Sequence, residues 1–151
     1  MNDLWESQSE ALRLWTKRCG ENDLVIKLNT GGGKTLVGLL VGQALINELK
    51  KPVLYLCPNN QPVRQTADKA QEIGLATVTY EAGPGGLPPE FLNGTAILVA
   101  AYKAVFHGRS KFGVLATGTE PVMVGGIICD DAHAALSVVR DAFSISITHA
   151  D

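Results

Sequence analysis

Three consecutive glycines followed by a lysine and a threonine make residues 29–35 the segment of this chain best suited to chemistry. Successive glycines can take positive φ and bring backbone N–H groups close to an anion. A helix that begins directly after them would add the positive end of its dipole. In this order, Lys34 would reach the β- and γ-phosphates of a nucleoside triphosphate, and the Thr35 hydroxyl would ligate Mg²⁺. The predicted nucleotide-binding residues are Thr30, Gly31, Gly32, Gly33, Lys34 and Thr35.

The elements around this loop support the prediction. Residues 24–28 form a short apolar stretch that predicts a strand, and residues 34–49 predict a helix, so the glycines fall in a strand-to-helix turn. Leu28 stands where the general phosphate-loop pattern has its first glycine. A plain glycine-rich linker is the alternative, but a linker would not lie between a strand and an apolar helix.

Two adjacent carboxylates near the other end of the chain are the second chemical feature. Asp130 and Asp131 follow the apolar run 122–129, which predicts a buried parallel strand. Ligands of open α/β sheets bind beyond the carboxyl ends of the strands. We therefore predict that Asp130 holds Mg²⁺ and that Asp131 orients or deprotonates the attacking water. The alternative for Asp131 is the N-cap of a helix beginning at Ala132.

Taken together, these segments resemble superfamily 2 helicases of the DEAD/DEAH-box type. Residues 29–35 resemble motif I, in which the first glycine is commonly replaced, and residues 130–133 resemble the DEAH variant of motif II, here Asp-Asp-Ala-His. Three weaker similarities occur in the family's order: residues 5–12 to the segment around the Q-motif glutamine, residues 58–65 to motif Ia, and residues 97–102 to the strand and turn written I-L-V-A-T-Y.

The resemblance implies an N-terminal RecA-like lobe over residues 1–151, with a three-layer α/β fold around a mainly parallel sheet, that uses ATP and Mg²⁺. By the same analogy, Gln8 would hydrogen-bond the adenine edge, and His133 would couple the nucleotide site to a nucleic-acid site. Arg64 and Gln65 would lie near the nucleic acid. The simpler alternatives are a surface glutamine, a histidine in the first turn of a helix, and an ordinary amphipathic helix face.

Three departures from the family pattern bear on activity. Asp131 replaces the usual glutamate and is one methylene shorter, so it must either reach the water through a shifted backbone or act less efficiently, which allows slow hydrolysis. Ala101 stands where the family often has a threonine. Asn59 and Asn60 replace a Thr-Arg pair, which removes a cation that could bind a nucleic-acid phosphate.

Composition indicates a globular, cytoplasmic domain. The chain has 151 residues, 46% of them hydrophobic and 19% charged, enough for one core. A net charge of -2 gives no electrostatic footprint for nucleic acid. The three cysteines, Cys19, Cys57 and Cys129, lack metal-site spacing, and the latter two are expected to be reduced core thiols. No apolar run is long enough to predict a membrane span.

Hydrophobic periodicity and turn residues predict the remaining elements. The expected helices are 7–18, 34–49, 61–73, 102–106 and 132–142, the expected strands are 24–28, 53–57, 76–80, 96–100 and 122–129, and the expected loops are 81–94 and 107–121. Residues 143–148 alternate like a strand.

Three classes of function follow from these observations. The first is the ATP-binding part of a DNA or RNA helicase or translocase, and the second is the P-loop ATPase motor of a restriction or remodelling complex. The third is a weakly hydrolysing, nucleotide-gated interaction module. The resemblance further implies that the chain ends before the strand of motif III, which in RecA-like lobes lies between the strands of motifs I and II. A second RecA-like lobe with its arginine finger would then be a partner, and the isolated chain would hydrolyse ATP barely.

Overall fold

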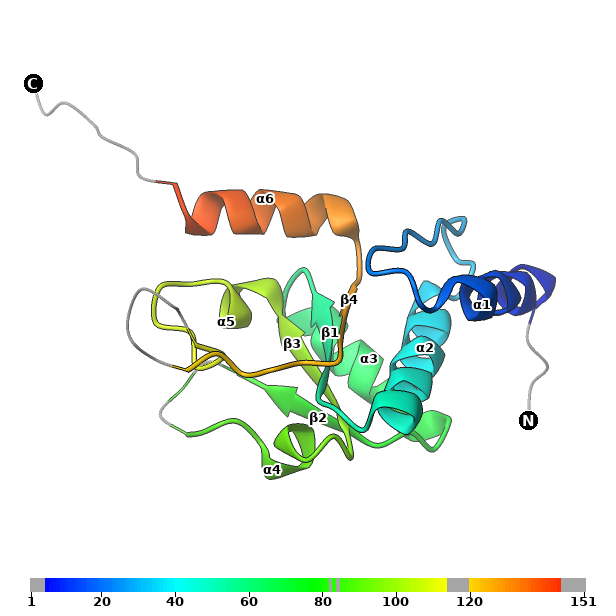
Figure 1. The fold of residues 1–151 in the computed structure, drawn as a ribbon. Coiled ribbons are helices and arrows are strands. Elements are labelled where there is room, and N and C mark those ends of the chain that lie inside the picture. The colour runs from blue at the N-terminus through cyan, green and yellow to red at the C-terminus, as the bar shows by residue number, and fades with distance from the viewer. Residues whose placement is uncertain (1–4, 82, 84, 114–119, 145–151) are drawn as a thin grey trace, which may run out of the picture.

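A computed structural model describes residues 5–81, 83, 85–113 and 120–144 of the chain. The described elements form an α/β fold around a single parallel sheet (Figure 1). In chain order they are α1 (Glu6–Arg18), α2 (Lys34–Leu49), β1 (Val53–Cys57), α3 (Asn60–Glu72), β2 (Thr77–Tyr80), α4 (Pro89–Leu92), β3 (Ile97–Ala101), α5 (Tyr102–Val105), β4 (Gly126–Cys129) and α6 (Ala132–Ala142).

The sheet has the strand order β2-β3-β1-β4, and all its strands run parallel. Every residue of β1 and β3 is buried, which explains why both strands read as unbroken apolar runs rather than as alternating patterns. Leu56 of β1 is in register with Ala100 of β3 and Cys129 of β4. The carboxyl ends of these three strands therefore meet at one edge, and the residues that follow them face the same space.

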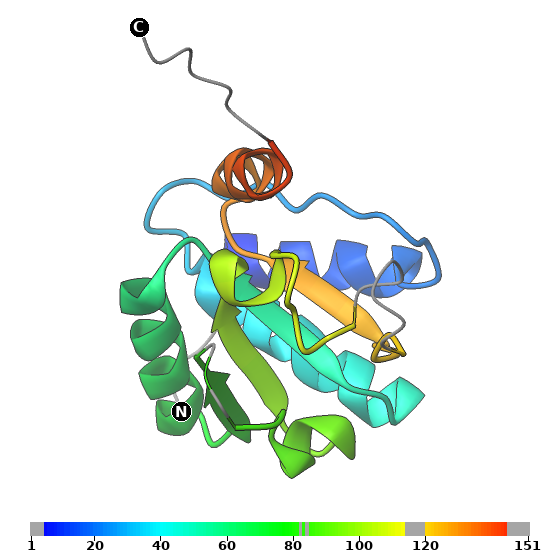
Figure 2. The ribbon, with the colours of Figure 1, turned by 90° about the vertical axis from the view of Figure 1, so that its left-hand side faces the viewer.

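Helices and loops cover both faces of the sheet (Figure 2). On one face, Leu39 and Ile46 of α2 and Val63 and Ala70 of α3 pack against alternate residues of β1 and β3. On the other face, a second cluster joins the remaining strand residues to α4, α5 and α6 and to the loop that carries Phe112. The three-layer α/β architecture expected from the sequence is confirmed, with the core split by the sheet into two clusters.

Most of the expected elements are found within one or two residues of their predicted bounds, but residues 24–28 were predicted wrongly. This stretch lies outside the described helices and strands, and Val25 is 90% exposed. An apolar pattern predicts a strand, but it does not tell whether another strand lies beside it to pair with. A shorter error concerns the predicted loop 81–94, in which Pro89–Leu92 form the single turn α4 and bury Phe91.

The strand that leads to Asp130 differs from its prediction as well. Only Gly126–Cys129 of the apolar run 122–129 pair with the sheet, and β4 is an edge strand rather than a buried one. Ile127 is 50% exposed and Cys129 is exposed, so the expectation of a core thiol holds for Cys57 and is wrong for Cys129. Among the described strands, only β1 pairs with β4, which leaves its outer edge open. The predicted strand 143–148 falls largely outside the described residues.

Candidate functional site

The loop between residues 29 and 33 takes the backbone shape that its glycines permit. Gly31 and Gly33 have φ of 79° and 72°, a region that side chains with a Cβ rarely adopt. Gly32 N–H donates to the Asn29 carbonyl at 2.9 Å and closes a tight turn. Helix α2 begins directly afterwards at Lys34, so the loop leads into a helix amino terminus as expected.

The side chain of Gln8, in α1, packs against this loop. Its side chain is 5% exposed; Nε2 donates to the Gly32 carbonyl and Oε1 accepts from Trp5 N–H, both at 3.2 Å. A Cβ on Gly33 would lie 2.1 Å from Gln8 Nε2, so the amide packs directly on the loop. The alternative of an ordinary surface glutamine is therefore wrong. Contact between Gln8 and an adenine stays a prediction.

Asp130 lies at the carboxyl end of β4, where two hydrogen bonds hold its main chain. Its N–H donates to the Leu56 carbonyl at 2.9 Å, and its carbonyl accepts from the Tyr102 hydroxyl at 2.7 Å. Burial raises the pKa of the Asp130 carboxyl and the charge of Asp131 raises it further, whereas the charge of Lys34 and the Asp131 backbone N–H lower this pKa. Lys34 and Asp130 are thus far apart in sequence, yet the charge of Lys34 acts on the Asp130 carboxyl.

Asp131 serves as the N-cap of α6, which was the alternative reading of this residue. Its Oδ1 accepts from Ala134 N–H at 3.4 Å, and its backbone is left-handed, with φ of 56°. A non-glycine residue in this conformation is strained, although aspartate tolerates it better than most. A capping role leaves the second carboxylate oxygen available, and activation of water by Asp131 stays a prediction. His133 is exposed in the first turn of the same helix.

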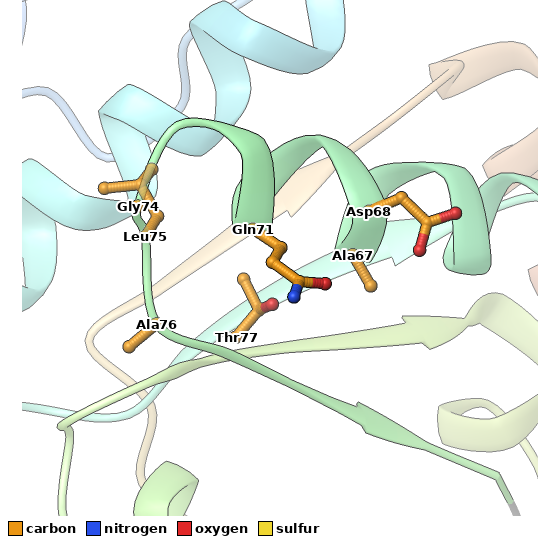
Figure 3. Close-up of a pocket in the computed structure, with 7 residues that line it drawn as sticks. All are labelled: Ala67, Asp68, Gln71, Gly74, Leu75, Ala76 and Thr77. Atoms are coloured by element: carbon orange, nitrogen blue, oxygen red, sulfur yellow. The ribbon is translucent and has the colours of Figure 1, made fainter.

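The predicted nucleic-acid residues lie on α3. Arg64 and Gln65 are both exposed there. At the amino end of α3, a hollow of about 650 Å³ opens beside the carboxyl ends of β1 and β3. It is lined by residues that include Asn59, Asn60, Glu81 and Lys103, a mixed set of charges. A second hollow, about 500 Å³, lies at the other end of α3 and is lined by α3 and the approach to β2 (Figure 3).

Sequence reasoning missed two tyrosines near the site. Tyr55 in β1 and Tyr102 at the start of α5 are almost completely buried, on opposite faces of the sheet. Tyr102 holds the Asp130 carbonyl through the hydrogen bond given above. A tyrosine within an otherwise apolar strand or turn is the signal that could have been noticed, because a buried hydroxyl needs a polar partner.

The described residues contain neither a metal-binding cluster nor a membrane-spanning helix. No cluster of three or more His, Cys, Asp or Glu side chains in this part of the chain could hold a metal ion by itself. None of its helices has the length and apolar character needed to cross a membrane.

Comparisons with known proteins agree with this geometry. Residues 2–144 match the protein family described as "Type III restriction enzyme, res subunit". Among solved structures, the chain is similar to a nuclease-deletion mutant of the Type ISP restriction-modification enzyme LlaGI in complex with a DNA substrate mimic, with a TM-score of 0.64 and 18% identity. The alignment covers 91% of this chain and 16% of that enzyme. No curated protein matches the sequence. The resemblance to the N-terminal lobe of superfamily 2 helicases and the RecA-like fold are confirmed.

Proposed function

The chain belongs to the family described as "Type III restriction enzyme, res subunit", and from this premise we propose that it supplies the ATP-binding part of a nucleic-acid-dependent motor. Residues 29–35 would bind the phosphates, with Lys34 on the β- and γ-phosphates. The observation that carries the proposal is that α2, which begins at Lys34 directly after the glycine loop, packs against Ile128 of β4, two residues before Asp130, so that the two sequence motifs belong to adjoining elements.

The donor set fits magnesium. Mg²⁺ prefers oxygen ligands, typically one or two from protein together with water and phosphate oxygens. Thr35 would offer a hydroxyl and Asp130 a carboxylate. Burial and the neighbouring Asp131 both disfavour the ionised form of Asp130, and a divalent cation beside the carboxylate would offset that cost. When bound, the ion would neutralise charge on the phosphates during transfer.

The remaining residues would orient the reactants. Gln8 would hold the loop through Gly32 and read the adenine edge, and Asp131 would direct the attacking water while it caps α6. His133 would couple this site to nucleic acid bound near Arg64 and Gln65. The loop and the dipole of α2 would bind the phosphates without a second lobe. The cation that stabilises the transferring phosphoryl group would come from a second RecA-like lobe.

Of the two motor classes, the restriction motor is the one that the family description favours. The similar solved structure is a restriction-modification enzyme bound to a DNA substrate mimic, which makes DNA the first nucleic acid to test here. This chain spans only 16% of that enzyme, so the other parts of a motor would lie in further domains or partners.

ATP turnover by the intact protein that contains this chain and its second RecA-like lobe, measured with single-stranded DNA, single-stranded RNA and duplexes, tests the motor. Lys34→Ala is the control, since it removes the phosphate-binding charge. Turnover that rises with one nucleic acid and disappears in Lys34→Ala would support the motor and identify its track. Turnover that no nucleic acid changes would contradict it.

A weakly hydrolysing, nucleotide-gated module is the second candidate. The capping hydrogen bond of Asp131 favours it, because that bond holds the shorter carboxylate to the backbone of α6. Asp131→Glu, in a protein that contains both lobes, discriminates between the two. A large gain in turnover without a change in ATP affinity would indicate a natural site with reduced hydrolysis, and a loss would indicate that the aspartate is suited to catalysis.

A further inference from the structure

The outer edge of β2 is open in the part of the chain that the structure describes. β2 lies at the end of the strand order and, among the described strands, pairs with β3 alone. Ile97 N–H donates to the Ala76 carbonyl at 3.0 Å, and Thr77 is in register with Ile97. Successive residues of a strand in a parallel ladder bond to opposite sides. The main-chain groups of Thr77 and Thr79 therefore face away from β3, where a further strand could bond them.

The sequence of β2 lacks the features that commonly protect an open edge from other chains. Natural edge strands often carry charged side chains or proline. β2 has the sequence Thr-Val-Thr-Tyr, with neither. Its threonines and valine are instead residues that suit pairing with a neighbouring strand. An occupant of this edge must be an extended polypeptide segment, because such a segment offers main-chain donors and acceptors at the spacing of β2.

The hollow of about 500 Å³ shown in Figure 3 lies beside the amino end of this strand. One wall belongs to α3 and the other to the approach to β2, and the lining includes Ala67, Asp68, Gln71, Gly74 and Thr77. Val78 and Tyr80 pack in the core cluster on the opposite face of the sheet, so Thr77 faces the side of α3. Every second side chain of a strand added to β2 would point to this side, and one of them would enter the hollow.

Asp68 gives the hollow its charge. It is the one charged residue of the lining, it is exposed, and it forms no ion pair with any residue that the structure describes, including Arg64 one turn away. The neighbouring Lys69 and Glu72 pair with each other, with Nζ and Oε2 2.8 Å apart. A cationic side chain in the hollow would meet the Asp68 carboxylate, and charge complementarity therefore favours lysine or arginine there.

We propose that this edge is a docking site for a partner protein: an extended segment of the partner adds to β2 as a strand and places a lysine or arginine in the hollow beside Asp68. A second copy of this chain fits less well, because β2 of that copy would bring no cation and each copy carries a net charge of -2. The inference goes beyond the proposed function, since the hollow lies at the amino end of β2, whereas the proposed nucleotide site lies at the carboxyl ends of the strands.

A synthetic peptide tests the site. The probe is fluorescein-labelled Thr-Val-Lys-Val-Thr, whose alternation would turn the lysine toward α3, and its binding is followed by fluorescence anisotropy. The control peptide has glutamate in place of the lysine and should bind more weakly. We expect Asp68→Asn to weaken binding of the lysine peptide by about two- to fivefold, the range of an exposed ion pair. Glu72→Gln is the matched control, because it removes the same charge from the same helix outside the hollow.

Thr79→Pro tests the main-chain hydrogen bonds. Proline removes the Thr79 N–H, which faces the open edge, so the pairing of β2 with β3 should remain. Val78→Pro removes an N–H that faces β3 and should lower the unfolding midpoint more than Thr79→Pro does, as circular dichroism would show. We expect folded Thr79→Pro to bind the lysine peptide about tenfold more weakly.

Four results would overturn the proposal. The first is that the lysine peptide binds no more tightly than the glutamate peptide, or that neither binds. The second is an equal effect of Asp68→Asn and Glu72→Gln, which would indicate a general effect of charge. The third is wild-type peptide binding by folded Thr79→Pro. If that variant does not fold, the two peptides and the Asp68→Asn comparison still decide.

The fourth result concerns other occupants of the edge. A dimer that Thr79→Pro abolishes would place a second copy on β2. A peptide that binds this chain, but not the longer protein that contains it, would place another domain of that protein there. Either outcome would exclude a separate partner protein.

Discussion

Two glycines of the phosphate loop share a backbone conformation but have different surroundings, and this permits a controlled test of how Gln8 supports the loop. Gly31 and Gly33 both have positive φ, 79° and 72°. A Cβ on Gly31 would meet nothing within 4 Å, whereas one on Gly33 would lie 2.1 Å from Gln8 Nε2. Alanine at either position carries the same backbone strain, but only Gly33→Ala displaces the amide.

The expected magnitudes follow from these contacts. Left-handed backbone costs an alanine about 1–2 kcal/mol, a term common to both variants. Displacing Gln8 loses its hydrogen bond to the Gly32 carbonyl and leaves a buried amide without a partner, which costs about 1–3 kcal/mol more. We therefore expect Gly33→Ala to lower the free energy of unfolding by about 1–3 kcal/mol more than Gly31→Ala does.

Urea unfolding followed by circular dichroism measures this difference. The extra loss should vanish when both alanines are compared in a Gln8→Ala background, because the side chain that clashes is then absent. Equal destabilisation by Gly31→Ala and Gly33→Ala in the wild-type background would refute the direct packing of Gln8 on the loop.

Three further predictions concern the acidic pair and its supports. The folded-state pKa of Asp130 is raised, so ionisation of this carboxyl opposes folding as pH rises past the ordinary aspartate range. Asp130→Asn should therefore raise the free energy of unfolding at pH 7. This gain should fade below about pH 4, and urea unfolding at several pH values would show it. Asp131→Ala should lower the free energy of unfolding by about 1–2 kcal/mol, because it removes the α6 cap and places an alanine at φ of 56°. Asp131→Asn should keep the fold and ATP binding but lose turnover. Equal stability of the two variants would contradict the capping role. Tyr102→Phe should cost about 1 kcal/mol in the same unfolding assay, since it removes the donor to the Asp130 carbonyl, and an unchanged midpoint would show that this hydrogen bond adds nothing.

Local chemistry made the helices and central strands predictable. The change from glycines to Lys34 predicted where α2 begins. Apolar runs bounded by turn residues predicted β1 and β3, because a strand that is buried on both faces has a continuous apolar sequence. Two roles were predicted for Asp131, activation of the attacking water and the N-cap of a helix. The structure describes the N-cap.

Features that depend on neighbours were not predictable in this way. Residues 24–28 and β4 carry equally apolar sequences, yet only β4 pairs, since pairing requires a strand at hydrogen-bonding distance and not only a suitable pattern. Gln8 could be guessed as a site residue only by resemblance, because its contact with Gly32 joins segments far apart in the chain. Tyr55 and Tyr102 were missed for the same reason.

Mg²⁺-dependent ATP binding, measured by calorimetry on the wild-type protein and on Lys34→Ala and Asp130→Asn, tests the central claim most directly. The claim is that residues 29–35 and Asp130 form one site. It predicts binding in the wild type that Mg²⁺ strengthens, a large loss of affinity in Lys34→Ala, and loss of the Mg²⁺ effect alone in Asp130→Asn. Wild-type affinity in both variants, or a wild-type protein that binds no ATP, would contradict it.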